Sequence, residues 1–218
     1  MKIERTNYDG IYQTWKNDKR VLLTKSIDGK NFFNEHMIDG YREIDPRRSK
    51  LAAAVIKKIS NIPIRENDKV LYLGAGHGYT PSFISDMIKN GIIYCIDFAP
   101  RVARDLILLC EERMNMIPIL ASANIPESYK NKIEKVDVIY QDVAQKNQVE
   151  ILFKNLVFLK KNGYVILCIK ARSIDVLKKP RLIFNQVKEE LKKRLNVIDY
   201  RELDPMEKDH CLFVCRLD

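Results

Sequence analysis

A glycine-rich loop is the first stretch of this 218-residue sequence whose residue types suit a chemical role. Gly74, Gly76 and Gly78 follow an apolar run at residues 70–73 and give the spacing G-x-G-x-G. Glycines between a strand and a helix allow a tight turn and let a ligand approach the backbone closely. A dinucleotide fingerprint would require a third glycine at position 79, where Tyr79 stands. The loop therefore favours a nucleoside ligand, although a purely structural turn has the same glycines.

A carboxylate follows at the place where such a ligand needs one. Asp97 ends the next predicted strand, at residues 92–96. From there its carboxylate can accept hydrogen bonds from both hydroxyls of a bound ribose. Asp97 at this position favours the ligand-binding loop over the structural turn.

Four more ionisable residues are expected to meet at one edge of the fold. Ligands in open α/β sheets bind outside the carboxyl ends of the strands. Asp142 and Lys170 end predicted strands there, His210 precedes the last strand, and Lys50 lies in the helix that enters the domain. Each has a simpler explanation: a solvated helix lysine, a loop histidine, a helix cap or the residue where a strand leaves the core. Their joint placement nevertheless predicts a catalytic site made of Lys50, Asp142, Lys170 and His210.

The elements that position these residues alternate between strand and helix from Pro63 onwards. Alternation predicts a parallel sheet with helices on both faces. The last two strands are joined only by residues 204–210, and so short a connection can join only antiparallel neighbours. The pattern predicts an α/β fold with a Rossmann-like seven-stranded sheet, mostly parallel with an antiparallel last strand, as in class I methyltransferases. We expect strands at residues 70–73, 92–96, 117–120, 136–140, 164–169, 197–203 and 211–216, and helices at 46–59, 79–88, 100–113, 149–159 and 180–195.

A small β domain is expected to precede this sheet. Short β segments at residues 11–15, 21–24 and 31–33 are separated by turn formers. This hairpin unit has too little apolar mass to stand alone, so it should pack on the larger domain. Asp45 can then cap a helix, with Pro46 at its first position. We therefore divide the chain into an N-terminal β domain at residues 1–44 and a main domain at residues 45–218.

The net charge of +9 points to a polyanionic partner, either a nucleic acid or an anionic membrane surface. Most of the basic excess lies in residues 1–60, and it is densest at Arg42, Arg47, Arg48 and Lys50. A solvated face would give the same cluster.

Composition also bears on the cellular location. No apolar run is long enough to span a bilayer, and the first residues contain no apolar signal-peptide core. The five cysteines form no C-x-x-C pair and lie mostly in apolar stretches, as reduced core cysteines do. We expect a cytoplasmic protein with no membrane partner and no metal site.

Short motifs distributed over the whole chain add a family resemblance. The most specific are R-S-K-L-A-A-A at residues 48–54 and D-V-A-Q at residues 142–145. Others are Y-R-E at 41–43, V-L-Y-L-G-A at 70–75, P-R-V at 100–102, V-D-V-I at 136–139, I-K-A at 169–171, and Glu207 with Asp209-His210. Together they resemble the fibrillarin family. With only 8 glycines the chain lacks the glycine- and arginine-rich tail of eukaryotic members, which favours the archaeal form.

The resemblance implies an activity and its partners. It implies a methyltransferase that moves a methyl group from S-adenosylmethionine to the ribose 2′-hydroxyl of rRNA and tRNA, directed by a box C/D guide RNA. It further implies docking on a coiled-coil scaffold protein and, indirectly, on a kink-turn-binding ribosomal-type protein.

The resemblance also implies roles for individual residues. Lys50, Asp142, Lys170 and His210 would be catalytic, and Lys170 is our candidate base. From the density of basic charge beside this site, we also expect Arg42, Arg47, Arg48 and Lys50 to contact RNA. The cofactor positions would be Gly74, Ala75, Gly76, Tyr79, Thr80, Asp97, Phe98, Ser122, Ala123, Asp142, Val143, Ala144 and Gln145.

Several positions depart from the family pattern and leave two alternatives open. His77 and Tyr79 replace the usual serine and threonine, Asp97 replaces glutamate, and Ser122 replaces an aspartate that reads the adenine. These changes bear on cofactor affinity. One alternative is a class I methyltransferase acting on another substrate. The other is a weakly active or non-catalytic paralogue that serves as a structural subunit.

Overall fold

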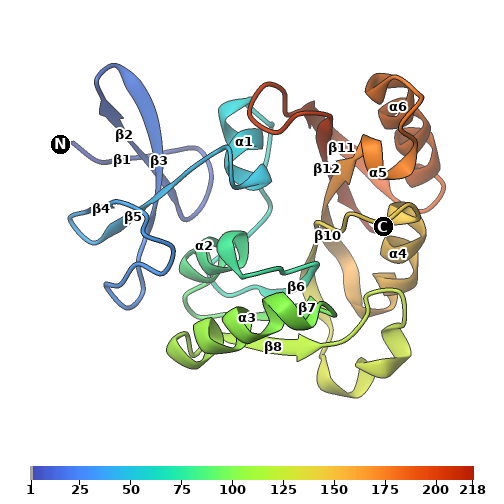
Figure 1. The fold of residues 1–218 in the computed structure, drawn as a ribbon, viewed down its shortest axis with the longest axis horizontal. Coiled ribbons are helices and arrows are strands. Elements are labelled where there is room, and N and C mark those ends of the chain that lie inside the picture. The colour runs from blue at the N-terminus through green and yellow to red at the C-terminus, as the bar shows by residue number, and fades with distance from the viewer. Residues whose placement is uncertain (1) are drawn as a thin grey trace.

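The chain forms two β-sheets, a small N-terminal one and a larger one covered by helices (Figure 1). The structure is a computed structural model that describes residues 2–218. The N-terminal sheet is antiparallel throughout, in the strand order β1-β2-β3-β5-β4. Its strands are β1 (Glu4–Arg5), β2 (Ile11–Lys16), β3 (Lys19–Lys25), β4 (Met37–Ile38) and β5 (Tyr41–Ile44).

The expected hairpin is therefore part of a larger sheet. Asn17 and Asp18 both have positive φ angles and form the tight turn between β2 and β3, as predicted. The strand predicted at residues 31–33 is wrong. There the backbone N–H groups of Phe32 and Phe33 donate to the carboxylate of Glu35 instead of to a neighbouring strand. Strand β5 takes the place beside β3.

The N-terminal sheet packs against the rest of the chain, as its small apolar mass predicts. Ile11, Leu22 and Ile44 are buried in one cluster with residues of α1 (Lys50–Ile56) and the larger sheet. The division into residues 1–44 and 45–218 stays a prediction.

Helix α1, which connects the N-terminal sheet to the larger sheet, begins later than the sequence indicates. Ser49 is its N-cap, with the side-chain oxygen accepting from the backbone N–H of Ala52. Asp45 instead opens a turn, since its carbonyl accepts from the N–H groups of Arg48 and Ser49. The predicted start at Asp45 and Pro46 is wrong because this turn separates them from the helix.

The larger sheet confirms the predicted fold class. Its order is β11-β12-β10-β9-β6-β7-β8, and β12 runs antiparallel to both of its neighbours. The pairs β10–β9, β9–β6, β6–β7 and β7–β8 are parallel. The strands are β6 (Lys69–Leu73), β7 (Ile92–Asp97), β8 (Met116–Leu120), β9 (Val136–Gln141), β10 (Leu159–Lys170), β11 (Asn196–Glu202) and β12 (His210–Arg216).

Helices cover both faces of this sheet. One buried cluster joins it to α1, α2 (Tyr79–Met87) and α3 (Pro100–Glu112). A second cluster joins the other face to α4 (Gln148–Asn155), α5 (Ala171–Ile174) and α6 (Pro180–Leu191). Three predicted helices extended too far: α1 ends at Ile56 instead of residue 59, Leu159 already pairs with Val136 in β10, and α6 ends four residues before Leu195. Short 3₁₀ turns lie at Pro126–Ser128, Lys130–Lys132 and Leu156–Phe158.

The carboxyl edge of the sheet gathers the polar residues that the sequence singled out. Lys170 at the end of β10 is the direct cross-strand partner of His210 at the start of β12. Directly opposed antiparallel residues point to the same face, so these two side chains are neighbours. No helix within residues 2–218 is long and apolar enough to cross a membrane.

Candidate active site

The glycine loop needs its glycines for space as well as for backbone angles. Gly74 has a φ of +83°, and a Cβ there would lie 2.4 Å from the carbonyl oxygen of Asp142. Gly78 has a φ of +87°, and its Cβ would lie 2.4 Å from a methyl carbon of Leu109. A side chain at either position would push the loop away from the segment that carries Asp142 or from α3. The loop is thus pressed against the end of β9.

Asp97 holds this loop from the neighbouring strand. One carboxylate oxygen accepts from the backbone N–H of Gly76 at 2.8 Å, and the other accepts from the N–H of Ala99 at 2.9 Å. The side chain is half-buried at the sheet edge. The residue predicted to bind a ribose therefore also shapes the turn, and its carboxylate keeps further lone pairs for a ligand.

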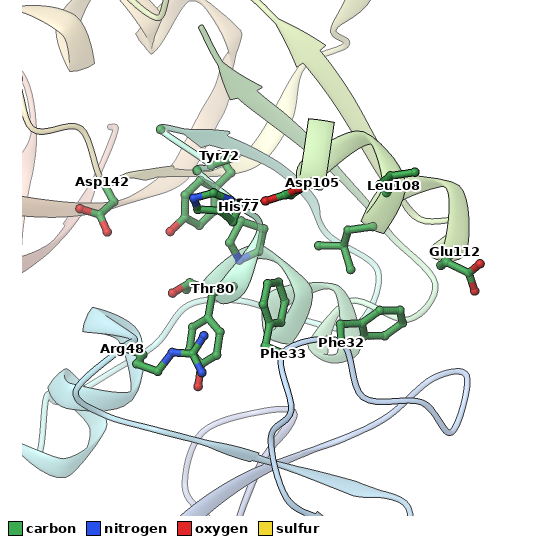
Figure 2. A pocket seen from close by; sticks show the side chains of 16 residues that line it. Phe32, Phe33, Arg48, Tyr72, His77, Thr80, Asp105, Leu108, Glu112 and Asp142 are labelled. Atoms are coloured by element: carbon green, nitrogen blue, oxygen red, sulfur yellow. Dashed lines mark hydrogen bonds and ion pairs between the residues drawn. The ribbon is translucent and has the colours of Figure 1, made fainter. Parts of the chain in front are cut away.

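A cavity of about 690 Å³ opens beside the loop (Figure 2). Asp142 lies at one end and Glu112 at the other. Phe32 and Phe33 form one wall, opposite Leu108 of α3. Its lining includes the predicted cofactor positions Gly74, Ala75, Gly76, Tyr79, Thr80 and Asp142, whereas Asp97, Phe98, Ser122, Ala123, Val143, Ala144 and Gln145 lie outside it.

The remaining predicted cofactor positions form a second rim at the ends of β7, β8 and β9. Asn124 connects two of these segments: its backbone N–H donates to Ser122 Oγ, and its amide donates to Gln145 Oε1 at 2.5 Å. Phe98 is 57% exposed beside Asp97. Sequence reasoning missed Asn124, although it lies two residues from Ser122.

Lys50 and Asp142 form the central ion pair of the site. Lys50 Nζ lies 2.9 Å from Asp142 Oδ2, and both side chains are mostly buried. Burial alone would lower the pKa of Lys50, but the negative charge of Asp142 and the hydrogen bond to it outweigh burial and raise that pKa. Lys50 is therefore a permanent cation at neutral pH. Asp142 does not cap α4, whose N-cap is Asn147.

His210 is buried and neutral beside this pair. Burial lowers its pKa, and the nearby positive charge of Lys50 lowers it further. Its Nδ1 lies 2.7 Å from the carbonyl oxygen of Lys208. A carbonyl can only accept, so Nδ1 carries the proton and Nε2 keeps a free lone pair. The structure thus orients His210 as a proton acceptor.

Lys170 completes the predicted set from the neighbouring strand. Its backbone N–H and carbonyl both bond to the side-chain amide of Gln148, which fixes the end of β10. The Lys170 side chain is exposed, unlike those of Lys50 and His210. The charges of Lys50, Asp142 and Lys170 all act on the pKa of His210, so the four residues share one site.

Glu207 is a further ionisable residue that the predicted site omitted. Burial raises the pKa of its carboxyl group, Lys50 opposes that effect, and Asp142 adds to it. Its Oε2 lies 3.9 Å from Nδ1 of His210. The spacing of three residues before His210 was the available sequence signal. A carboxylate here can stabilise the imidazolium that forms when His210 accepts a proton.

The arginine cluster divides into buried and exposed members. The prediction that Arg42 contacts RNA is wrong, because its side chain is fully buried. Its guanidinium pairs with Glu35 at 2.6 Å and with Asp86 at 2.8 Å. Arg47 and Arg48 are exposed, and the Arg48 guanidinium lies 4.0 Å from the ring centroid of Tyr79.

Arg42 therefore has a role in holding a cavity wall. Glu35, its partner, accepts from the backbone N–H groups of Phe32 and Phe33, which line the cavity. Asp86 on α2 also pairs with the buried Arg113, so the network ties the N-terminal sheet to α2 and α3.

Comparison with known proteins agrees with this fold. The family model described as Fibrillarin matches residues 3–218. The chain belongs to the fibrillarin family. A fibrillarin-like rRNA/tRNA 2′-O-methyltransferase from Methanocaldococcus jannaschii is 47% identical over an alignment of length 215 residues, and the match covers 95% of this chain and 94% of that relative.

Two solved fibrillarin structures align over nearly all of the chain. Aeropyrum pernix fibrillarin in complex with natively bound S-adenosylmethionine has a TM-score of 0.89 and 38% identity, covering 99% of this chain and 98% of that one. The fibrillarin of a fibrillarin/Nop5p complex has a TM-score of 0.90 and 38% identity, covering 98% and 100%.

Proposed function

We propose that this chain transfers a methyl group from S-adenosylmethionine to the ribose 2′-hydroxyl of rRNA and tRNA. The observation that carries this function is the half-buried Lys50–Asp142 pair at the end of the glycine-loop cavity, with a neutral His210 beside it. The activity is that of its 47% identical relative from Methanocaldococcus jannaschii.

The residues at the glycine loop suit this cofactor. A Cβ at Gly74 would collide with the Asp142 backbone, whereas a Cβ at Gly76 would meet no described residue within 4 Å apart from its two chain neighbours. The loop thus leaves room for a ligand beside Gly76. We propose that Gly74, Gly76, Tyr79 and Thr80 hold the cofactor from the cavity side and that Asp97 accepts from its ribose. The second rim would hold the rest of the cofactor, through Phe98, Ser122, Ala123 and residues 142–145.

The cofactor, when bound, supplies a methyl group on a positively charged sulfur. The protein must then align the acceptor oxygen and receive its proton. Lys50 stays charged, so it can hold the acceptor or its phosphate, and Asp142 fixes its position.

Proton removal is best assigned to His210. The sequence-based hypothesis gave this role to Lys170. His210, however, is neutral and presents the free lone pair of Nε2, because Nδ1–H donates to the Lys208 carbonyl. Glu207 and Asp142 lie close enough to stabilise the imidazolium. Lys170, exposed beside His210, then binds the RNA backbone.

The partners are inferred from the same family. Because a fibrillarin with 38% identity forms a complex with Nop5p, we propose that this chain docks on a coiled-coil scaffold protein. A box C/D guide RNA would select the target nucleotide, and a kink-turn-binding ribosomal-type protein would complete the particle. The five buried free cysteines favour a reducing compartment, and we propose the cytoplasm.

Transfer of labelled methyl groups tests this function. The chain is assembled with guide RNA, scaffold protein and kink-turn protein and supplied with methyl-labelled S-adenosylmethionine. We expect label in the guided RNA that ribonuclease removes and protease does not. Label in protein would favour another substrate class. Failure of the assembled particle to bind the cofactor in calorimetry would favour a structural subunit.

A further inference from the structure

A second group of basic residues begins at Lys170, outside the predicted RNA-binding cluster. Residues 170–181 contain five basic residues and one acidic residue, Asp175. The five are Lys170, Arg172, Lys178, Lys179 and Arg181, all of them at least partly exposed. We name residues 175–181, which join α5 to the first turn of α6, the 175–181 loop.

The topology places this loop at the catalytic edge. β10 ends at Lys170 on that edge, α5 follows at once, and α6 begins there at Pro180. The ion pair between Arg181 and Glu202 confirms the position, because Glu202 ends β11, which runs parallel to β10. The loop also lies on the opposite face of the sheet from α1 (Figure 1), and Arg47 and Arg48 come shortly before α1 in the chain.

The loop has a defined shape. Asp175 Oδ1 accepts from the backbone N–H groups of Leu177 and Lys178. Arg172 donates to the carbonyl of Val176 at 2.7 Å and to the carboxylate of Asp209 at 3.0 Å. Asp209 directly precedes His210, so Arg172 ties the loop to the catalytic histidine.

Most of the charge on the loop is available to a partner. Among the ion pairs of residues 2–218, none involves Lys179 or Lys170. Lys178 and Arg181 make only loose pairs of 3.8 Å. Leu177 is 92% exposed at the tip of the loop. The cations of Lys178 and Lys179 can bind phosphates, and the apolar side chain of Leu177, which precedes them in the chain, can pack on an exposed sugar or base.

We propose that the 175–181 loop is an RNA-docking element that binds the phosphate backbone next to the methylated nucleotide. Lys178 and Lys179 contact phosphates, and Leu177 packs on the sugar–base face. With Arg47 and Arg48 on the other side of the sheet, the loop would hold the strand across the catalytic edge from both faces. This inference rests on the proposed function, since it names where the substrate of that site binds.

Direct RNA binding tests the loop without requiring methyl transfer. The probe is a fluorescein-labelled guide–target RNA duplex, titrated with the full chain in 50 to 200 mM salt and followed by fluorescence anisotropy. We expect the Lys178→Ala/Lys179→Ala variant to bind about 3- to 10-fold more weakly and its salt slope to fall by roughly 1 to 2. The matched control is Lys192→Ala/Lys193→Ala, an equal charge change at the opposite end of α6.

Methylation in the assembled particle gives the second readout. The loop variant should raise the KM for target RNA about 3- to 10-fold with kcat and cofactor affinity unchanged. An equal effect in the control, or unchanged RNA affinity in the loop variant, would overturn the proposal. If Leu177→Ser instead loses the scaffold protein while RNA affinity stays constant, the loop is a protein interface and the proposal is wrong. Absence of methylation by the wild-type particle would count against the proposed function, and the anisotropy comparison would still decide the loop.

Discussion

Lys50 Nζ lies 2.9 Å from Oδ2 of Asp142, although 92 residues separate the two in sequence. Lys50 is the first residue of α1, and Asp142 follows the last residue of β9. The same Asp142 segment is pressed against Gly74 of the glycine loop. Asp142 thus links α1 to the glycine loop: its carboxylate pairs with Lys50, and its backbone carbonyl lies against Gly74.

Asp142→Asn should slow methyl transfer about 100-fold or more, because it leaves a half-buried Lys50 without its counter-charge. The measurement is single-turnover methylation of a guided RNA at saturating cofactor. Asp137→Asn is the matched control, since Asp137 lies in β9, the strand that Asp142 follows, and pairs with Lys160 away from the site. A rate for Asp142→Asn within threefold of the control would contradict the role of the pair.

The pH dependence of the rate should follow His210. Its pKa lies below 6.5, and the neutral form is the proton acceptor. The rate should therefore rise with pH through a pKa below 6.5 and be level between pH 7 and 8. His210→Gln should be slow at all pH values and lack the acidic limb. A rate that keeps climbing above pH 9 in the wild type would return proton removal to a lysine.

Much of the fold could be predicted from the sequence, because strand–helix alternation and the glycine loop are local patterns. The position of Asp97 at the end of β7 follows from a local pattern too. The burial of Arg42 could not be predicted from a local pattern, because it depends on Glu35 in a loop and on Asp86 in α2. Sequence placed it with exposed arginines because charge clusters carry no information on such distant partners.

The start of α1 shows a different limit. Asp45-Pro46 and Ser49 are both good helix-start signals, and they are four residues apart. Only the turn closed by the Asp45 carbonyl decides between them. In the same way, Asn124 and Glu207 join the site through neighbours that the chain brings together after folding.

Arg42→Ala should lower the free energy of unfolding by about 3–5 kcal/mol, because it leaves Glu35 and Asp86 buried with one fewer counter-charge. Urea unfolding followed by circular dichroism measures this. Arg47→Ala, at an exposed position nearby, should change stability by no more than about 0.5 kcal/mol. Equal stability of the two variants would refute a structural role for Arg42.

Gly74→Ala should lose cofactor affinity and stability together. The substitution adds a Cβ at a φ of +83° and 2.4 Å from the Asp142 carbonyl oxygen. Gly29→Ala tests the backbone angle alone, since its φ is +73° and no neighbour within residues 2–218 lies near its Cβ position. We expect Gly29→Ala to cost about 1 kcal/mol of stability and Gly74→Ala clearly more. Calorimetry should detect weaker cofactor binding only for Gly74→Ala, and equal binding by both variants would count against the close approach of loop and Asp142.

The central claim, methyl transfer to a ribose 2′-hydroxyl chosen by a guide, has one direct measurement. Two target RNAs of the same sequence are offered to the assembled particle, one with ribose and one with 2′-deoxyribose at the guided nucleotide. We predict that labelled methyl enters the first at that nucleotide alone and does not enter the second. Equal labelling of both targets would contradict the claim, because the methyl group would then be on another atom.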